Sequence, residues 1–409
     1  MKIGKKNIYA LPPNDVRLLH MYAQQLQENG TARQWNRSGI TNLLIGEPDF
    51  PTPEHIREAA IEAIKHNAIG YGPPAGWPWL RSLLAEKIKR VNDYAVNSEQ
   101  VAVTMGGTGA VQATLMAVIG RGDEILVPDP GWPQYQLQIA CCGARAIRYE
   151  LSPSSGWLPD PAQLEKLISR RSRMLIINTP ANPSGAVFSR QLVANLLSFA
   201  QRHDLYLLSD ECYDEILFEG EHVSPASLLS NREFESGRVI CIYTFSKTYA
   251  MTGWRIGYLA AGKELIKTII HVLDSTYTNI CTFVQAAAAA ALTGPQTCVQ
   301  EMLQAYQKRR DCALASLSTQ GRYFYTPQGT FYLLIDISNS YAPELQGNAF
   351  ARLLLRKRAI AVAPGSSFGQ VAPYFVRVSL VAPEQDIVHG IDEICTLANS
   401  DLTVVDEPF

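Results

Sequence analysis

Short runs of apolar, often β-branched residues alternate with longer stretches of helical periodicity between about residues 100 and 262. Most of these runs are apolar at consecutive positions, which is typical of a parallel sheet covered on both faces. The alternation predicts a doubly wound α/β domain that binds its ligand at the carboxyl ends of its strands. The expected strands are 101–104, 124–127, 174–178, 205–209, 239–243 and 258–261, and the expected helices are 108–119, 189–203 and 263–292.

The pattern changes after Gly294, where helical and strand-like runs are mixed. This mixture predicts a smaller α+β domain. We expect residues 51–294 to form the large domain and residues 295–409 the small one. Residues 1–50 should join the small domain, and one long helix at 263–292 should be shared. In the small domain, helices are expected at 296–320, 348–358 and 384–397, and strands at 331–337 and 375–380.

Composition argues against several classes of protein. The 409 residues are 47% hydrophobic and 18% charged, with a net charge of −2 and dispersed Lys and Arg. Neither a nucleic-acid nor a membrane partner is therefore expected. None of the eight cysteines forms a CxxC pair or has histidines at metal-ligand spacing, so we expect no metal and a cytoplasmic protein with reduced thiols. The basic start lacks the apolar stretch of a secretion signal, and no run is long enough to span a bilayer.

Lys247 is the most informative residue, in the segment YTFSKTYAMTGWRIG of residues 243–257. An amine in partly apolar surroundings is more often neutral, and a neutral amine can form a Schiff base with an aldehyde. Ser246 and Arg255 are suitable donors for a dianionic phosphate. An aldehyde and a phosphate are the two groups that pyridoxal 5'-phosphate (PLP) presents together. A solvated loop lysine is the alternative when the segment is taken alone.

A glycine-rich turn offers a second phosphate contact. Gly106, Gly107 and Thr108 follow an expected strand and open an expected helix. Glycines let backbone amides approach an anion, and a helix N-terminus adds a partial positive charge. A tight turn without a ligand is the alternative, but together with Ser246 and Arg255 this turn would complete a phosphate site.

Two carboxylates, Asp210 and Glu211, follow the apolar run 205–209. A carboxylate at the end of a buried strand is costly unless it has a cationic partner. The protonated ring nitrogen of PLP would be such a partner, and the pair would keep the ring able to delocalise a carbanion. The residues alone leave both acids as candidates.

Over about residues 43–394, the chain resembles the class I and II aminotransferases, which are fold-type I PLP enzymes. The motifs that carry the resemblance occur in the family's order: GGTGA at 106–110, DPGWPQY at 129–135, NTPANPSG at 178–185, SDECY at 209–213, and SK with GWRIG at 246–257. The resemblance implies a mixed, mainly parallel sheet in the large domain, a PLP cofactor and a homodimer with shared active sites.

The resemblance also implies a role for each motif. It chooses Asp210 over Glu211 as the partner of the ring nitrogen, which leaves Glu211 structural. Ordinary packing or turn formation remains the alternative for Tyr213, Trp132 and Asn182. The other implied cofactor contacts are Lys247 with the aldehyde, Gly106, Gly107, Thr108, Ser246 and Arg255 with the phosphate, Tyr213 and Asn182 with the 3'-oxygen, Trp132 with the ring face, and Tyr71 with the phosphate of the neighbouring subunit.

On the substrate side, Arg377 shares one face of an expected strand with Phe375 and Ser379. Its planar fork suits an α-carboxylate bound through two hydrogen bonds. The resemblance assigns it this role and adds the backbone amide of Gly46, with Trp132 and Asn182 also near the substrate. A structural salt bridge is the alternative for Arg377.

The residue that recognises the substrate side chain is not identified by any motif, and no arginine is marked as the partner of a second carboxylate. Residues 8–15 would form a mobile cover over the site. Four aromatic residues suit either an aromatic or broad substrate or ordinary packing, namely Tyr135, Trp157, Tyr277 and Tyr332.

We therefore expect a PLP-dependent aminotransferase that moves an amino group from an L-amino acid to a 2-oxo acid by a ping-pong mechanism. Lys247, Asp210 and Tyr213 would be its catalytic residues. A C–S lyase, a decarboxylase or an amino-acid oxidase on the same fold is the first alternative, because all of them use the same lysine and ring. A PLP-binding regulator without catalysis is the second, disfavoured because the residues before Gly46 show no helix-turn-helix pattern and no basic patch.

Overall fold

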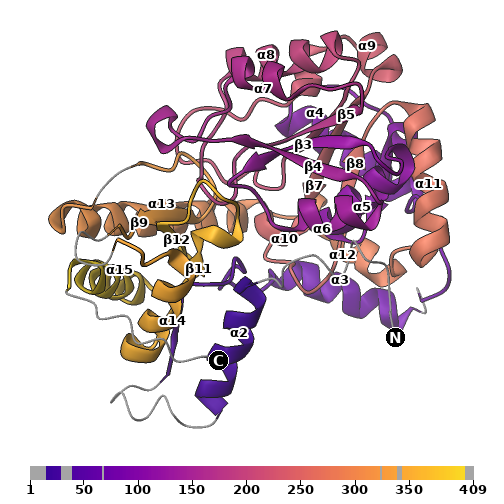
Figure 1. Cartoon of the computed structure of the whole chain (residues 1–409). Helices are drawn as coiled ribbons and strands as arrows, with labels where there is room; N and C mark the ends of the chain where they lie inside the picture. The colour runs from indigo at the N-terminus through magenta and orange to yellow at the C-terminus, as the bar shows by residue number, and fades with distance from the viewer. Residues whose placement is uncertain (1–14, 29–38, 67–68, 323–324, 339–342, 401–409) are drawn as a thin grey trace, which may run out of the picture.

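A seven-stranded sheet forms the centre of the larger part of the molecule (Figure 1). The structure is a computed structural model that describes residues 15–28, 39–66, 69–322, 325–338 and 343–400. Strand β8 is antiparallel to both of its neighbours, and the other adjacent pairs are parallel, so the sheet is mixed and mainly parallel as expected. In spatial order the strands are β2 (Val101–Thr104), β8 (Gly257–Ala260), β7 (Val239–Thr244), β6 (Tyr206–Asp210), β5 (Ser172–Asn178), β3 (Glu124–Asp129) and β4 (Arg145–Glu150).

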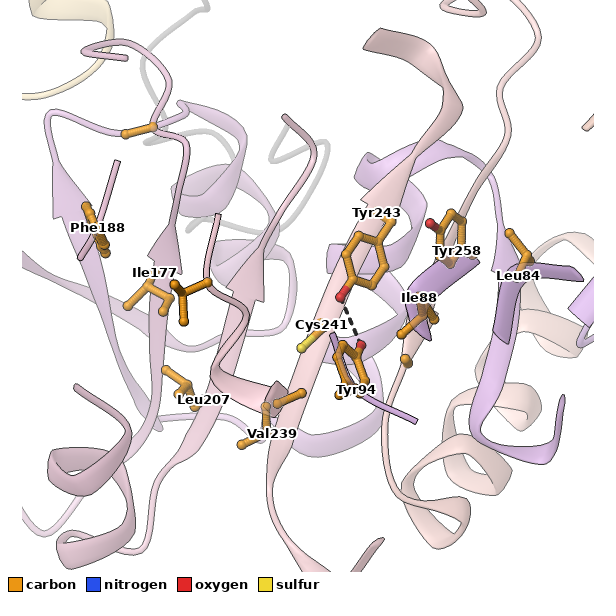
Figure 2. Close-up of a cluster of buried hydrophobic side chains, with 14 of the residues drawn as sticks. Leu84, Ile88, Tyr94, Ile177, Phe188, Leu207, Val239, Cys241, Tyr243 and Tyr258 are labelled. Atoms are coloured by element: carbon orange, nitrogen blue, oxygen red, sulfur yellow. Dashed lines mark hydrogen bonds between the residues drawn. The ribbon is translucent and has the colours of Figure 1, made fainter. Parts of the chain in front are cut away.

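Successive residues of the central strands contribute to two different cores. In β7, Ile240 and Ile242 pack into one core, while Cys241 and Tyr243 pack into the other. Figure 2 shows the second core, in which the hydroxyl groups of Tyr94 and Tyr243 form a hydrogen bond of 2.9 Å. Because both faces are covered, alternate positions are equally buried, and this explains the continuous apolar runs in the sequence.

Helices cover both faces of the sheet. One core includes α5 (Gly106–Val118), α6 (Gln134–Cys141) and α11 (Lys263–Tyr277). The other includes α3 (Glu54–Lys65), α4 (Pro78–Val91), α7 (Pro161–Leu167), α8 (Arg190–Arg202), α9 (Asn231–Ser236) and α12 (Thr282–Thr293). Single turns of 3-10 helix lie at Ser98–Gln100, Pro153–Ser155, Pro225–Leu228 and Gly365–Ser367. This arrangement confirms the doubly wound α/β prediction.

A third core lies mainly in the C-terminal part of the chain. Leu19, Leu43 and Leu44 from the N-terminal part of the chain also belong to it. The exact domain boundaries remain a prediction. The elements here are α2 (Asp15–Glu28), α13 (Thr297–Thr319), α14 (Gly347–Arg358), α15 (Glu384–Asn399), the antiparallel strands β9 (Tyr332–Asp336), β12 (Phe375–Ser379) and β11 (Ala363–Pro364), and the parallel pair β1 (Thr41–Asn42) and β10 (Ile360–Ala361).

The prediction of one long helix at 263–292 is wrong. The chain forms α11 and α12, separated by a turn in which Thr278 has a φ of 63°. The two helices pack against opposite faces of the sheet, so the chain must break between them.

Strand β4 was missed because it is an edge strand whose residues are largely half-buried or exposed, and the apolar signal in the sequence is therefore weak. Among the described residues, no helix has the length and apolar character needed to cross a membrane.

The buried Lys87 provides a test of this packing. Its ammonium lies 3.0 Å from Asp214 and 2.9 Å from Glu215 in the interior of the protein. The variant Lys87→Met would leave two carboxylates without their cation, so we expect the free energy of unfolding to fall by about 3–5 kcal/mol. Chemical denaturation of the purified protein measures this change.

The matched control is Lys65→Met, because Lys65 pairs with Glu62 on the surface, where both side chains are more than half exposed. Loss of such a pair costs less than about 1 kcal/mol. An equal fall in the free energy of unfolding in both variants would contradict the stabilising role of the buried Lys87 ion pairs.

Candidate active site

Three neighbouring parallel strands end at one cavity. Strand β5 ends at Asn178, β6 at Asp210 and β7 at Thr244, and Asn178 is paired with Asp210 across the sheet. The cavity has a volume of about 670 Å³, and all three residues line it. It therefore lies at the carboxyl edge of the sheet, where an α/β fold is expected to bind its ligand.

Most of the predicted site residues come together here. The cavity is lined by Gly46, Gly107, Thr108, Trp132, Asn182, Asp210, Tyr213, Ser246, Lys247, Arg255 and Arg377. Among the described residues, its lining carries four basic side chains, Arg17, Lys247, Arg255 and Arg377, and two acidic ones, Glu47 and Asp210. The excess of positive charge favours an anionic ligand.

Lys247 lies on the short helix α10 (Phe245–Thr248), directly after β7. The hydroxyl of Thr244 caps this helix by accepting a hydrogen bond from the backbone N–H of Ser246 (3.2 Å). The Lys247 ammonium donates to the carbonyl oxygen of Gly46 at 2.6 Å. The cap and this contact hold the amine at the cavity wall, next to the segment that carries Gly46.

The first turn of α5 and Arg255 form a candidate anion site. Gly106 has a φ of 67°, and a Cβ atom there would lie 2.7 Å from an Arg255 guanidinium nitrogen, so only glycine allows this close approach. The Ser246 hydroxyl lines the same cavity and accepts a hydrogen bond from the Thr244 hydroxyl at 3.0 Å. Helix amides, a hydroxyl and a guanidinium together are suitable donors for a phosphate.

Asp210 is buried at the end of β6. One carboxylate oxygen accepts a hydrogen bond from the Tyr135 hydroxyl, and the other accepts one from the Cys212 backbone N–H at 3.2 Å. Burial raises the pKa of Asp210, while these hydrogen bonds act in the opposite direction. Its neighbour Glu211 does not line the cavity and instead bonds to His222 and Ser224, both at 2.8 Å. Of the two acids that the sequence left as alternatives, Asp210 lines the cavity and Glu211 does not.

Arg377 is buried in β12 and has only neutral partners among the described residues. It donates to the Asn182 side-chain oxygen at 3.0 Å and to the Leu44 carbonyl at 2.8 Å. Its Nε is buried without a hydrogen-bond partner in the described chain, and burial lowers its pKa. A buried cation in such surroundings needs a carboxylate, and a bound substrate would supply one.

Two aromatic rings fix the plane of this guanidinium. Its central carbon lies 4.0 Å from the ring centre of Tyr332 and 4.7 Å from that of Phe368. The Tyr332 hydroxyl is also 2.9 Å from the hydroxyl of Tyr213. Tyr332 therefore joins the predicted substrate-binding arginine to the predicted cofactor-binding tyrosine.

An ion pair outside the cavity holds the Gly46 segment in place. Arg309 of α13 binds both carboxylate oxygens of Asp49, at 2.8 and 2.7 Å, and donates to the Leu380 carbonyl at 3.1 Å. Because Leu380 follows β12, this arginine links the Gly46 segment to the strand that carries Arg377. A Cβ atom on Gly46 would lie 1.7 Å from the Tyr332 hydroxyl, so the segment packs directly on that ring.

Not every predicted residue reaches the cavity. Tyr71 does not line it, and its side chain is 90% exposed in the single chain. Trp157 is fully buried against Phe375, which agrees with the packing alternative, and Tyr277 does not line the cavity either.

Of the predicted cover at residues 8–15, all but residue 15 lie outside the described part of the chain. No cluster of His, Cys, Asp and Glu in the described ranges could hold a metal ion.

Sequence reasoning missed several contributors to the site. Val16 and Arg17 of α2 and Phe368 line the cavity although they belong to no recognised motif. Tyr332 and Tyr135 were left as unassigned aromatic residues, and their positions alone did not distinguish them from Trp157. The available signal for Tyr135 was its place three residues after Trp132, the spacing of a single turn, in which the Tyr135 backbone N–H donates to the Trp132 carbonyl at 3.2 Å.

The comparisons with known proteins agree with this geometry. The sequence model of the family described as aminotransferase class I and II matches residues 38–394. The aspartate/prephenate aminotransferase of Thermus thermophilus is 36% identical over 369 residues, which cover 89% of this chain and 93% of the relative. The aromatic-amino-acid aminotransferase 2 of Thermococcus litoralis is 33% identical, covering 93% of this chain and 95% of the relative.

Among solved structures, the aspartate aminotransferase from Thermus thermophilus with maleate matches with a TM-score of 0.88 and 34% identity. The match covers 97% of this chain and all of that chain. The chain thus belongs to the class I and II aminotransferases, has the type I fold of this family and is a transaminase.

The close contact at Gly46 generates a prediction for substrate binding. In Gly46→Ala, the added methyl must displace Tyr332, which fixes Arg377 and contacts Tyr213. We expect KM for the amino acid to rise at least about tenfold, equivalent to about 1.4 kcal/mol. Steady-state kinetics with several donors measures the change.

The control is Gly120→Ala, because a Cβ atom at Gly120 would meet only the Asp123 side chain at an ordinary 3.6 Å. Its kinetics should match those of the unmodified enzyme. An unchanged KM in Gly46→Ala would show that the Tyr332 position does not matter for substrate binding.

Proposed function

We propose that this transaminase holds PLP in the described cavity and moves an amino group from an L-amino acid to a 2-oxo acid by a ping-pong mechanism. The observation that carries the proposal is the convergence of Lys247, Asp210 and Arg377 on one cavity. An amine, a buried carboxylate and a buried guanidinium match the aldehyde, the ring nitrogen and the substrate carboxylate, respectively.

The residues present fit PLP. The anion site at the first turn of α5 suits the phosphate, and the buried Asp210 has no cation among its hydrogen-bond partners in the described chain. When bound, PLP supplies an aldehyde carbon that links covalently to an amine and a protonated ring that withdraws electrons from the substrate Cα. Both features require the protein to orient the ring firmly.

In this proposal each wall of the cavity holds one part of the cofactor. The Asn182 side-chain oxygen accepts a hydrogen bond from Arg377, so the Asn182 NH2 group is free to donate to the 3'-oxygen of PLP. The Tyr213 hydroxyl would donate to the same oxygen. Trp132 would stack on the ring face, and Asp210 would bind the ring nitrogen. The backbone amides of Gly107 and Thr108 and the side chains of Ser246 and Arg255 would hold the phosphate, with Gly106 leaving room for the guanidinium.

Arg377 and the Gly46 backbone amide hold the substrate α-carboxylate in this account. A carboxylate that stays bound by a buried guanidinium is not released as carbon dioxide, which favours transamination over decarboxylation. With PLP bound, the Lys247 amine would be the group that takes the proton from the substrate Cα and returns it to the reacting group. Hydrolysis would then release the 2-oxo acid, and an acceptor 2-oxo acid would run the same half-reaction in reverse.

We also propose acidic or aromatic L-amino acids as the donor class. The cavity lining includes a basic side chain, Arg17, and the rings of Trp132 and Phe368, and the Phe368 ring centre lies 4.7 Å from the guanidinium carbon of Arg377. The relatives named for aspartate, prephenate and aromatic amino acids support this choice.

The lysine assignment has a direct test. Borohydride reduction of the PLP-loaded protein, followed by peptide mass mapping, should place a pyridoxyl group on Lys247, and Lys247→Ala should lose at least about a thousandfold in turnover as its proton carrier is removed. The control is Lys267→Ala, because Lys267 is largely exposed and pairs with Glu264 on the surface. A pyridoxyl group on any other lysine would refute the assignment.

The same preparation distinguishes transamination from the other reactions of this fold. Aspartate or phenylalanine alone should yield about one equivalent of 2-oxo acid per site, without oxygen uptake. Adding 2-oxoglutarate or pyruvate should then restore the starting absorption spectrum. Sustained release of carbon dioxide or sulfide, or consumption of oxygen, would instead support a decarboxylase, a lyase or an oxidase.

We propose further that the active form is a homodimer in which Tyr71 reaches the phosphate in the partner's cavity. Tyr71 is 90% exposed in the single chain, and Ile61, Ile64 and Ile69 nearby in the sequence are also about half exposed or more. Exposed apolar residues of this size favour burial in a subunit interface.

We also propose a cytoplasmic location, because all eight cysteines are free thiols.

The dimer is tested by mixing two impaired variants, Tyr71→Phe and Lys247→Ala. A mixed dimer contains one cavity with both native residues, so we expect up to about a quarter of the native activity to return if subunits pair at random. Native mass spectrometry verifies that mixed dimers form. No recovery in verified mixed dimers would place Tyr71 in the cavity of its own subunit or outside the site.

A further inference from the structure

Tyr135 contacts two parts of the site without lining the cavity. It is almost fully buried in the first turn of α6, and its hydroxyl donates a hydrogen bond to a carboxylate oxygen of Asp210. Its ring meets the Trp132 ring edge-on, with 5.3 Å between the ring centres and an angle of 85° between the planes. Tyr135 thus contacts both Trp132, which we propose stacks on the cofactor ring, and Asp210, which we propose binds the ring nitrogen.

The Tyr135 hydroxyl is suited to act as a permanent donor. Burial and the adjacent Asp210 charge raise the pKa of Tyr135 well above its usual value, so the phenol keeps its proton. The other titratable groups that act on Asp210 are Cys212, whose backbone N–H also donates to the carboxylate, and the neighbouring Glu211, whose charge opposes ionisation. Tyr135 is therefore the only side-chain hydroxyl among the described residues that donates to this carboxylate.

We propose that Tyr135 is a positioning residue that keeps Asp210 ionised and oriented toward the cofactor ring nitrogen. This inference rests on the proposed function, because it assigns the ring nitrogen to Asp210. Tyr135 touches neither the cofactor nor the substrate, so it acts only through Asp210 and Trp132. Without its hydroxyl, one carboxylate oxygen loses its donor in a buried site, and a carboxylate that takes up a proton no longer stabilises a positive ring nitrogen.

The test uses the PLP-loaded enzyme with a 15N-labelled cofactor ring nitrogen. Nitrogen NMR at fixed neutral pH reports directly whether that nitrogen carries a proton. We expect a protonated shift in the unmodified enzyme and a displacement toward the neutral shift in Tyr135→Phe. Single-turnover Cα deprotonation should also slow about tenfold or more, the scale of one charge-assisted hydrogen bond.

The matched control is Tyr149→Phe, which also removes a buried tyrosine hydroxyl. Tyr149 donates to the Ile176 carbonyl at 2.8 Å and has no contact with Asp210 in the described chain. Its nitrogen shift and turnover should match those of the unmodified enzyme. Cofactor content and melting temperature are measured for both variants, so that loss of folding is separated from loss of the hydrogen bond.

Asp210→Asn separates failure of this inference from failure of the proposed function. An unchanged nitrogen shift in Asp210→Asn would refute the role of Asp210 itself. A changed shift there with an unchanged one in Tyr135→Phe would overturn only the role of Tyr135. If both variants shift, adding Tyr135→Phe to Asp210→Asn should cause no further change, whereas additive effects would indicate a general structural role and overturn the proposal.

A second variant covers the case in which Tyr135→Phe does not retain cofactor. A fluorinated tyrosine at position 135 keeps the ring and the hydroxyl but makes the phenol more acidic. The nitrogen shift should then change with the number of fluorine atoms. A shift that is independent of phenol acidity would overturn the proposal.

Discussion

A buried carboxylate at the end of β6 is the constraint on which the site depends. Asp210 follows three buried residues of β6, Leu207, Leu208 and Ser209, and is itself buried, so its carboxylate is removed from bulk water. Two hydrogen bonds from the protein offset only part of the cost of its charge. The free energy cost that remains favours a cationic ligand beside Asp210, and the proposed pyridine ring of PLP would supply that cation. The residues proposed for the phosphate, the ring face and the aldehyde then surround that place.

The substrate end is coupled to this arrangement through the segment around Gly46 and through β12. Arg377 reaches across from β12 to the Asn182 side chain, while Lys247 reaches the Gly46 carbonyl. The Arg309–Asp49 ion pair keeps that segment against the strand. Residues from the large sheet and from the C-terminal core are therefore joined by the same few hydrogen bonds, so we expect the orientation of a bound substrate to depend on that of the proposed cofactor.

Much of the fold was predictable because the central strands are buried on both faces and so read as continuous apolar runs. Edge strand β4 lacks this signal, and the break at Thr278 is set by packing of α11 and α12 on opposite faces, which no local pattern records. In the site, Lys247, Asp210 and Asn182 lie in motifs whose chemistry can be argued from neighbouring residues. The roles of Tyr135 and Tyr332 arise from contacts with residues 75 and 119 positions away, which only the folded chain brings together.

The central claim is that Asp210 binds the ring nitrogen of PLP, and a crystal structure of the PLP-loaded enzyme tests it most directly. The account predicts an Asp210 carboxylate oxygen within about 2.7–2.9 Å of the ring nitrogen, the distance of a charge-assisted hydrogen bond. The Tyr135 hydroxyl should remain on the same carboxylate, and the Trp132 ring should lie over the pyridine face. A ring nitrogen that faces Glu211, solvent or any other group, with Asp210 more than about 4 Å away, would contradict the account.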